Sequence, residues 1–225
     1  MISIPVIAID GPAASGKGAV AQAIAEQLGF HYLDSGAIYR AAALAVVQAG
    51  KNIDRPDLSE AEIAEIASGM RLSFKSDEIW LANQNITDVI RTEACGNNAS
   101  KIAVLPQLRQ ALLQLQRNFR RTPGLVAEGR DMGTVVFPDA GLKIYLTASA
   151  PIRAARRYKQ LMEKGINANM RDLLNEIEQR DARDLGRSVA PLRSGNDTIT
   201  IDTTPLDLAQ SIEAVLKFYH AVNKM

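Results

Sequence analysis

The sequence VIAIDGPAASGKGA, at Val6–Ala19, decides the fold. An apolar run leads into a glycine-rich turn, after which apolar residues recur at helical intervals. Gly11, Gly16 and Lys17 have the spacing of a phosphate-binding loop, in which glycines let the backbone wrap round anionic oxygens and the lysine reaches the terminal phosphates. A helix that begins there turns its positive dipole end toward the anion. This stretch predicts a strand, a nucleoside triphosphate site and a helix in succession.

One position of the loop departs from the usual pattern. The motif places Ser or Thr after the lysine to contact Mg²⁺, but Gly18 and Ala19 follow Lys17 and neither has a hydroxyl. A structural turn beside an ordinary surface lysine is the alternative interpretation. Such a turn needs no cation at the start of a helix, where the dipole is already positive. The loop therefore predicts phosphate binding and leaves the reaction open.

Composition restricts the class of protein. The chain has 225 residues, with 26 Lys and Arg against 25 Asp and Glu, so its charge indicates neither a nucleic-acid nor a membrane partner. A hydrophobic content of 47% is typical of a soluble globular protein. The single cysteine, Cys95, cannot form an internal disulfide, which fits a reducing cytoplasm. Residues 1–5 lack the basic segment of a signal peptide, and the apolar run stops at Asp10. We expect a soluble, cytoplasmic protein.

Five short apolar runs alternate with helical patterns along the chain. The runs are Ile4–Ile9, His31–Leu33, Leu125–Glu128, Leu142–Thr147 and Thr198–Asp202. The helical patterns are Gly16–Leu28, Gly36–Gln48, Thr92–Arg121 (two helices broken before Pro106) and Leu206–Ala221. This alternation predicts an α/β fold of the P-loop NTPase type, a five-stranded parallel sheet with helices on both faces.

Two segments interrupt the alternation. The first combines a helical Ser59–Ser68 with short strands at Arg71–Lys75, Ile79–Leu81 and Gln84–Thr87, and predicts a small β-containing insertion. The second, Ile152–Arg193, is helical and rich in arginine, and predicts a lid. We expect one folded unit with its core at about 1–50, 88–150 and 194–225, the insertion at about 51–87 and the lid at about 151–193. Lys164–Met170 and Ser188–Asp197 are expected to lack regular structure.

Polar clusters follow four of the predicted strands. They are the glycine-rich loop, Asp34–Gly36, Gly129–Asp131 and the arginine-rich segment. In a parallel sheet such clusters meet at the carboxyl edge, where ligands bind. Arginine suits phosphoryl transfer because its planar fork stays charged and binds two phosphate oxygens. The alternative is a solvated charged helix pair, in which arginines and the interspersed acids neutralise one another. The pattern favours a site for two phosphorylated substrates beneath a lid.

The motifs together resemble those of bacterial cytidylate kinases. The matching sequences are Gly11–Ala19, LDSGAIYR at Leu33–Arg40, GRDMGTVVFPDA at Gly129–Ala140 and RDARD at Arg180–Asp184. The similarity extends over nearly the whole chain and includes the insertion, which would bind the nucleoside monophosphate. It implies transfer of the γ-phosphoryl group of ATP to CMP or dCMP, with Mg²⁺ held by the ATP phosphates and water and no direct protein ligand.

The resemblance also implies the site residues. For ATP these are Gly11, Pro12, Ala13, Ala14, Ser15, Gly16, Lys17, Gly18, Ala19, Arg156 and Arg157. For CMP, Ser100, Arg109 and Asp184 would recognise the base, Arg40, Arg130 and Arg187 the phosphate, and Ser35, Asp131 and Arg180 the sugar. Lys17, Arg130, Asp131 and Arg187 would take part in catalysis. Position 19 departs from the family's threonine, so we hypothesise that backbone amides and water replace the hydroxyl, with reduced affinity for metal or ATP.

Two other functions stay open at this point. A P-loop kinase could act on another small acceptor, such as UMP or shikimate. A nucleotide-binding sensor that has lost turnover is the second alternative, and Ala19 is its only support. Phosphorylation rates over a panel of acceptors distinguish the three.

Overall fold

A computed structural model describes residues 4–75, 78–163, 165–186, 192, 195 and 197–222. The chain divides into two compact units. The first, which we call the core unit, comprises Met1–Leu33 and Phe119–Met225, and the second, the middle unit, comprises Asp34–Asn118. The middle unit contains more of the chain than the expected insertion at 51–87. The functional division into core, insertion and lid stays a prediction.

A five-stranded sheet forms the centre of the core unit. Its strands are β1 (Val6–Asp10), β2 (His31–Asp34), β6 (Leu125–Gly129), β7 (Leu142–Thr147) and β8 (Ile199–Asp202). They lie in the order β2-β6-β1-β7-β8. The strand β1 pairs in parallel with both β6 and β7, and β7 pairs in parallel with β8. The predicted five-stranded parallel sheet is confirmed.

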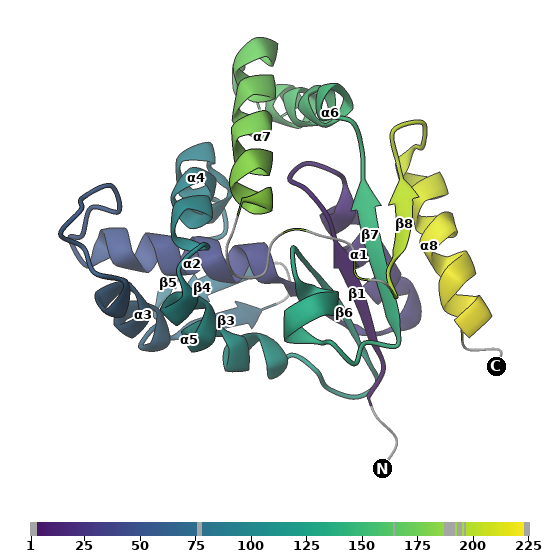
Figure 1. Cartoon of the computed structure of the whole chain (residues 1–225), viewed down its shortest axis with the longest axis horizontal. Helices are drawn as coiled ribbons and strands as arrows, with labels where there is room; N and C mark the ends of the chain where they lie inside the picture. The colour runs from purple at the N-terminus through teal and green to yellow at the C-terminus, as the bar shows by residue number, and fades with distance from the viewer. Residues whose placement is uncertain are drawn as a thin grey trace. The chain divides into compact units, whose positions relative to one another are not determined.

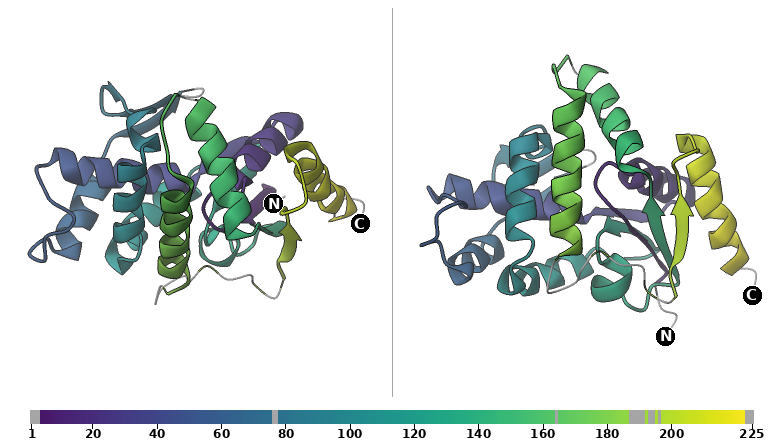
Figure 2. Two further views of the ribbon diagram at one scale, coloured as in Figure 1. Left: turned by 90° about the horizontal axis from the view of Figure 1, so that it is seen from above. Right: turned by 45° about the horizontal axis from the view of Figure 1, so that its top comes forward.

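Helices follow the strands as the apolar periodicity predicts. In the core unit they are α1 (Lys17–Leu28), α6 (Ala150–Glu163), α7 (Met170–Leu185) and α8 (Leu208–Val222), with a π-helical turn at Met132–Val136. Helices α6 and α7 pack against each other after the end of β7 (Figures 1 and 2). Of the segment expected to be irregular at Lys164–Met170, residues 165–169 lie outside both helices, Met170 begins α7, and Lys164 lies outside the described residues. Most of the second segment expected to be irregular, Ser188–Asp197, lies outside the described residues.

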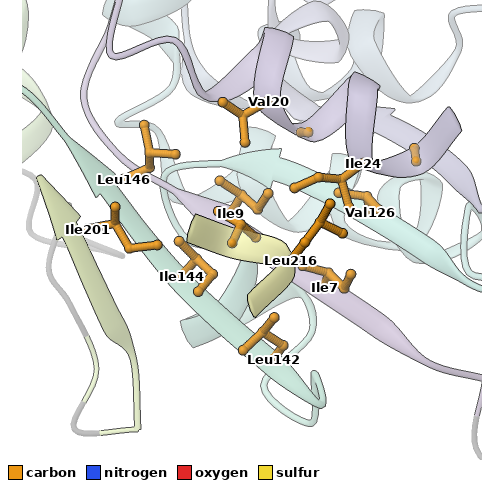
Figure 3. Packing of buried hydrophobic residues seen from close by; sticks show 13 residues of the cluster. Ile7, Ile9, Val20, Ile24, Val126, Leu142, Ile144, Leu146, Ile201 and Leu216 are labelled. Atoms are coloured by element: carbon orange, nitrogen blue, oxygen red, sulfur yellow. The ribbon is translucent and has the colours of Figure 1, made fainter. Parts of the chain in front are cut away.

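Aliphatic side chains fill the space between the sheet and two of these helices (Figure 3). Ile7 and Ile9 of β1 pack with Val20 and Ile24 of α1 and with Leu216 of α8. All five residues of β1 are buried, so both faces of this central strand are covered. The carboxyl end of β1 is therefore fixed, and the loop that follows it starts from a rigid position.

The middle unit combines helices with a small antiparallel sheet. Its helices are α2 (Ser35–Gln48), α3 (Glu60–Ser68), α4 (Glu93–Ile102) and α5 (Pro106–Arg117), with a 3₁₀ turn at Val89–Arg91. The strands are β3 (Leu72–Lys75), β4 (Glu78–Leu81) and β5 (Gln84–Asn85), in that order. The β-containing insertion and the break before Pro106 are as predicted. In the described part of the chain, no helix combines the length and the apolar character needed to span a membrane.

Candidate nucleotide site

The glycine-rich loop connects β1 to α1 through backbone conformations that favour glycine. A Cβ at Gly11 would lie 2.0 Å from the carbonyl oxygen of Leu146 in β7, so only glycine fits there. Gly16 precedes α1 with a φ of 91°. Because Gly16 has no side chain, no cap covers the first N–H groups of α1, and its first turn contains no acid. This end of α1 can therefore bind an anion.

Lys17, the first residue of α1, is held by oxygens in the described structure. Its Nζ donates to the carbonyl of Pro12 at 3.3 Å and lies 3.6 Å from Oε2 of Glu128. Oε1 of Glu128 accepts a hydrogen bond from the Tyr32 hydroxyl at 3.0 Å. A Cβ at Gly18 would lie 2.8 Å from this same oxygen, so the glycine makes room for the buried carboxylate.

Sequence reasoning missed Glu128, although one signal was present. Glu128 is the only charged residue in the otherwise apolar strand Leu125–Gly129. A buried carboxylate is costly unless it is paired. Its partner Lys17 comes from a strand–loop–helix unit more than a hundred residues earlier, which parallel pairing of Ile9 with Glu128 brings alongside.

Ser15 carries the loop's only hydroxyl. Its Oγ is buried and has no hydrogen-bond partner among the described residues. Buried hydroxyls in native proteins are normally hydrogen-bonded, so a ligand oxygen at this point would satisfy it. Ala19, by contrast, is exposed on α1.

Arg130 follows β6 and forms an ion pair with α7. Its Nε lies 2.7 Å from Oδ2 of Asp184, which is 1% exposed. Burial by itself lowers the pKa of Arg130, but the carboxylates of Asp184, Glu128 and Asp10 raise it above its ordinary value. Arg130 therefore stays charged in a buried position, which suits a group that binds phosphate.

Asp10, at the end of β1, holds the turn that follows Arg130. Its two carboxylate oxygens accept the backbone N–H groups of Met132 at 2.8 Å and Gly133 at 2.9 Å. Burial raises the pKa of Asp10 to about 7, although these two hydrogen bonds act in the opposite direction. Asp131 is also buried and precedes the π-helical turn. The sequence did not identify Asp10, because its contacts depend on the register between β1 and β6.

The arginines of the lid segment occupy different environments. Arg156 donates to the carbonyls of Ser15 at 3.1 Å, Thr203 at 2.6 Å and Leu206 at 3.1 Å. Arg157 is half-buried and donates to Gln160 at 3.4 Å. Arg180 is half-buried on the same helix as Asp184. Arg187 lies outside the described residues.

The remaining predicted acceptor residues belong to the middle unit. The Ser35 hydroxyl donates to Oε1 of Gln116 at 2.8 Å, and both side chains are buried. Arg40 lies 3.9 Å from Asp34, whose other carboxylate oxygen caps α2 by accepting from the Ala37 N–H.

Two further acceptor residues lie on α4 and α5. Ser100 is buried on α4, and Arg109 is buried on α5. Arg109 donates to the carbonyl of Ala103 at 3.1 Å, and its guanidinium lies 5.9 Å from the centre of the Tyr39 ring. Tyr39 and Gln116 carried no sequence signal, because their contacts with Arg109 and Ser35 join positions far apart in the chain.

No group of three or more His, Cys, Asp or Glu side chains within the described residues could by itself hold a metal ion. Two buried carboxylates, Glu128 and Asp131, lie in β6 and two residues beyond its end. Mg²⁺ in phosphoryl-transfer sites keeps several waters and binds one or two carboxylates together with the substrate phosphates. These residues fit a Mg²⁺ ion that arrives with a nucleotide.

The strand order, the glycine-rich loop after β1 and Lys17 at the start of α1 define a P-loop nucleotide-binding protein of the α/β class. Residues 7–221 match the family model of cytidylate kinase. The chain belongs to the cytidylate kinase family, as the motifs indicated.

Curated relatives match over nearly their full length. A cytidylate kinase of Cupriavidus necator is 53% identical, with 99% of this chain and 98% of the relative covered. A cytidylate kinase of Nitrosomonas europaea is 50% identical, with the same coverage. Among solved structures, a gluconokinase from Sinorhizobium meliloti is 14% identical and has a TM-score of 0.49, covering 98% of this chain and 95% of that one.

Proposed function

We propose that this protein transfers the γ-phosphoryl group of ATP to CMP and dCMP, giving ADP and CDP or dCDP. The observation that carries the proposal is the uncapped start of α1, with Lys17 as its first residue and a glycine-rich loop before it. Membership of the cytidylate kinase family supports the choice of acceptor.

On the donor side, the loop N–H groups and Lys17 would bind the β- and γ-phosphates. The contacts of Lys17 with Pro12 and Glu128 are long, at 3.3 and 3.6 Å, so a phosphate oxygen can replace them. The buried Ser15 hydroxyl supplies a further donor. Glu128 and Asp131 would hold water around Mg²⁺, which neutralises phosphate charge when it is bound.

On the acceptor side, Arg40, Arg130 and Arg187 would bind the phosphate of CMP, and Ser35, Asp131 and Arg180 the sugar. Asp184, Ser100 and Arg109 would recognise the base. A buried carboxylate favours cytosine because cytosine presents an amino donor where uracil presents a carbonyl. Asp184 accepts from Arg130 through Oδ2, and an ionised carboxylate can accept several hydrogen bonds at once.

Phosphoryl transfer requires that the two substrates are correctly positioned and that positive charge lies near the transferred group. The γ-phosphoryl group moves in line between two oxygens, with its charge spread over three equatorial oxygens. Arg130 keeps its charge in a buried place, because the acids around it raise its pKa. Arginines of the lid segment would exclude water and so suppress ATP hydrolysis.

The acceptor panel tests this proposal. Initial rates with ATP, Mg²⁺ and CMP, dCMP, UMP, AMP or shikimate should give the highest kcat/KM for the two cytidylates. A higher kcat/KM for UMP or shikimate would establish the other kinase assignment. ATP binding without phosphorylation of any acceptor would identify a sensor.

We also propose the oligomeric state and the cellular location of the protein. The family resemblance implies a monomer, and the single cysteine fits a reducing cytoplasm. Light scattering on the purified chain should give a mass near 24.4 kDa at working concentrations, and twice this mass would contradict the monomer.

A further inference from the structure

Arg153 is a buried arginine of α6 that the proposed chemistry does not use. Its Nε donates to the carbonyl of Ala148 at 2.9 Å, and its Nη1 donates to the carbonyl of Ala13 at 3.1 Å. The same guanidinium forms a bidentate pair with Asp181, with Nη1–Oδ1 at 3.1 Å and Nη2–Oδ2 at 2.5 Å. One side chain thus connects the phosphate-binding loop to α7.

At the loop, this contact fixes the direction of a peptide group. The C=O and N–H of a trans peptide point in opposite directions. Because Arg153 holds the C=O of Ala13, the N–H of Ala14 points away from Arg153. Arg156 acts in the same way two residues later, through the carbonyl of Ser15. Phosphate-binding loops depend on N–H groups held in a fixed direction, so Arg153 acts on the loop through its backbone.

At α7, the contact fixes the helix that carries two proposed acceptor residues. Asp181 lies between Arg180 and Asp184 in the sequence of α7. Asp184 in turn pairs with Arg130 at 2.7 Å. Two ion pairs, Arg153–Asp181 and Arg130–Asp184, therefore hold α7 to the rest of the core unit. A bidentate pair fixes orientation as well as distance.

We infer that the Arg153–Asp181 pair is a positioning link that makes the binding of ATP and of the acceptor nucleotide cooperative. The inference rests on the proposed function, since Arg180 and Asp184 must contact the acceptor. Bound ATP would fix the conformation of the loop. The contacts of Arg153 with the Ala13 carbonyl and with Asp181 would then restrict the motion of α7. The acceptor then binds to a helix that is already in place. By linkage, the acceptor raises the affinity for ATP by the same factor.

The coupling factor is the quantity to measure. Isothermal titration of the full-length protein gives the Kd of CMP with and without saturating β,γ-imido-ATP and Mg²⁺. The reciprocal titration gives the Kd of β,γ-imido-ATP with and without CMP. We expect a factor of at least about fivefold in both directions for the wild type. Asp181→Asn, which keeps the volume of the side chain but removes its charge, should reduce the factor to less than about twofold.

Matched variants separate coupling from structure. Lys159→Met removes an exposed ion pair with Glu163 on the same helix and should keep the wild-type factor. Arg153→Lys keeps the charge but loses the fork, and should also reduce the factor. Asp181→Glu, which keeps a carboxylate at this position, should retain more of the coupling factor than Asp181→Asn. Thermal unfolding establishes that each variant is folded, and Arg153→Lys tests the link if Asp181→Asn is not folded.

Two results would overturn the inference. One is a folded Asp181→Asn or Arg153→Lys variant with the wild-type coupling factor. The other is a wild type that phosphorylates CMP yet binds the two nucleotides independently, in which case the proposed function stands and the link does not. If the wild type binds neither nucleotide, both the proposed function and the proposed link are contradicted.

Discussion

At the scale of single residues, the buried carboxylate of Asp10 connects the end of β1 to the turn that carries Arg130 and Asp131. It accepts two consecutive backbone N–H groups, of Met132 and Gly133. Asparagine in its place would offer only one oxygen, and its NH₂ group would face the other N–H. The residue therefore determines how the turn after β6 is held.

The raised pKa of Asp10 predicts a specific pH dependence of stability. Its folded-state pKa is about 7, against 3.8 for the free side chain, so the folded protein retains a proton that the unfolded chain releases. The free energy of unfolding should fall as pH rises from 4 to 7, by at most about 4 kcal/mol from this group. Urea unfolding of the wild type and Asp10→Asn across this range checks it. Parallel pH profiles for the two proteins would contradict the assignment to Asp10.

Ala19 gives a second prediction for a single residue. It lies exposed in the first turn of α1, at the position where the family resemblance implies threonine. Ala19→Thr should lower the KM for MgATP by roughly twofold to tenfold, the worth of one hydrogen bond. Ala19→Val is the matched control, since it adds a similar volume without a hydroxyl. No change in KM or kcat with threonine would refute the hypothesis that position 19 weakens the site.

Gln116 is expected to act through Ser35. Its Nε2 donates to the Leu112 carbonyl at 3.3 Å, which leaves Oε1 to accept the Ser35 proton. The Ser35 oxygen is then free only to accept, as recognition of a sugar hydroxyl requires. Gln116→Leu should raise the KM for CMP severalfold and leave the KM for ATP unchanged.

The exposed neighbour Gln114 provides the control for this experiment. Gln114→Leu, on the same helix, should alter neither constant. In a Ser35→Ala background, Gln116→Leu should have no further effect on the KM for CMP. Additive effects of the two substitutions would show that Gln116 does not act through Ser35.

At the scale of elements, the loop after β1 depends on close contact with β7. Gly11→Ala would bring a Cβ to 2.0 Å from the Leu146 carbonyl, a rigid backbone atom. We expect a loss of about 1–3 kcal/mol in the free energy of unfolding and a large rise in the KM for ATP. Gly141→Ala is the control, because no atom lies within 4 Å of its added Cβ. Equal stability and KM for the two variants would contradict this account of the loop.

The elements that the sequence predicted are those with a local signal. Apolar runs located all five strands of the core sheet, and Pro106 located the break between α4 and α5. The π-helical turn at Met132–Val136 was not foreseen, since Asp10 supports it from 122 residues away in the sequence. The family resemblance gave Arg156 as an ATP residue, but its contacts with Thr203 and Leu206 depend on packing that no sequence spacing reveals.

At the scale of the whole molecule, the proposed roles are divided between the two units. The core unit contains all the proposed ATP residues, together with Arg130, Asp131, Arg180 and Asp184. The middle unit contains Ser35, Arg40, Ser100 and Arg109. This division could not be read from composition, because both units have ordinary apolar cores. The proposed chemistry needs both sets of residues for one reaction.

Direct identification of the products tests this central claim. Purified protein is incubated with ATP, Mg²⁺ and CMP, and the nucleotides are separated by anion exchange, with Lys17→Met as the control. We predict equal amounts of ADP and CDP, and a loss of at least about 100-fold in rate for the variant. Formation of ADP and inorganic phosphate without CDP, or no turnover at all with CMP and dCMP, would contradict the account.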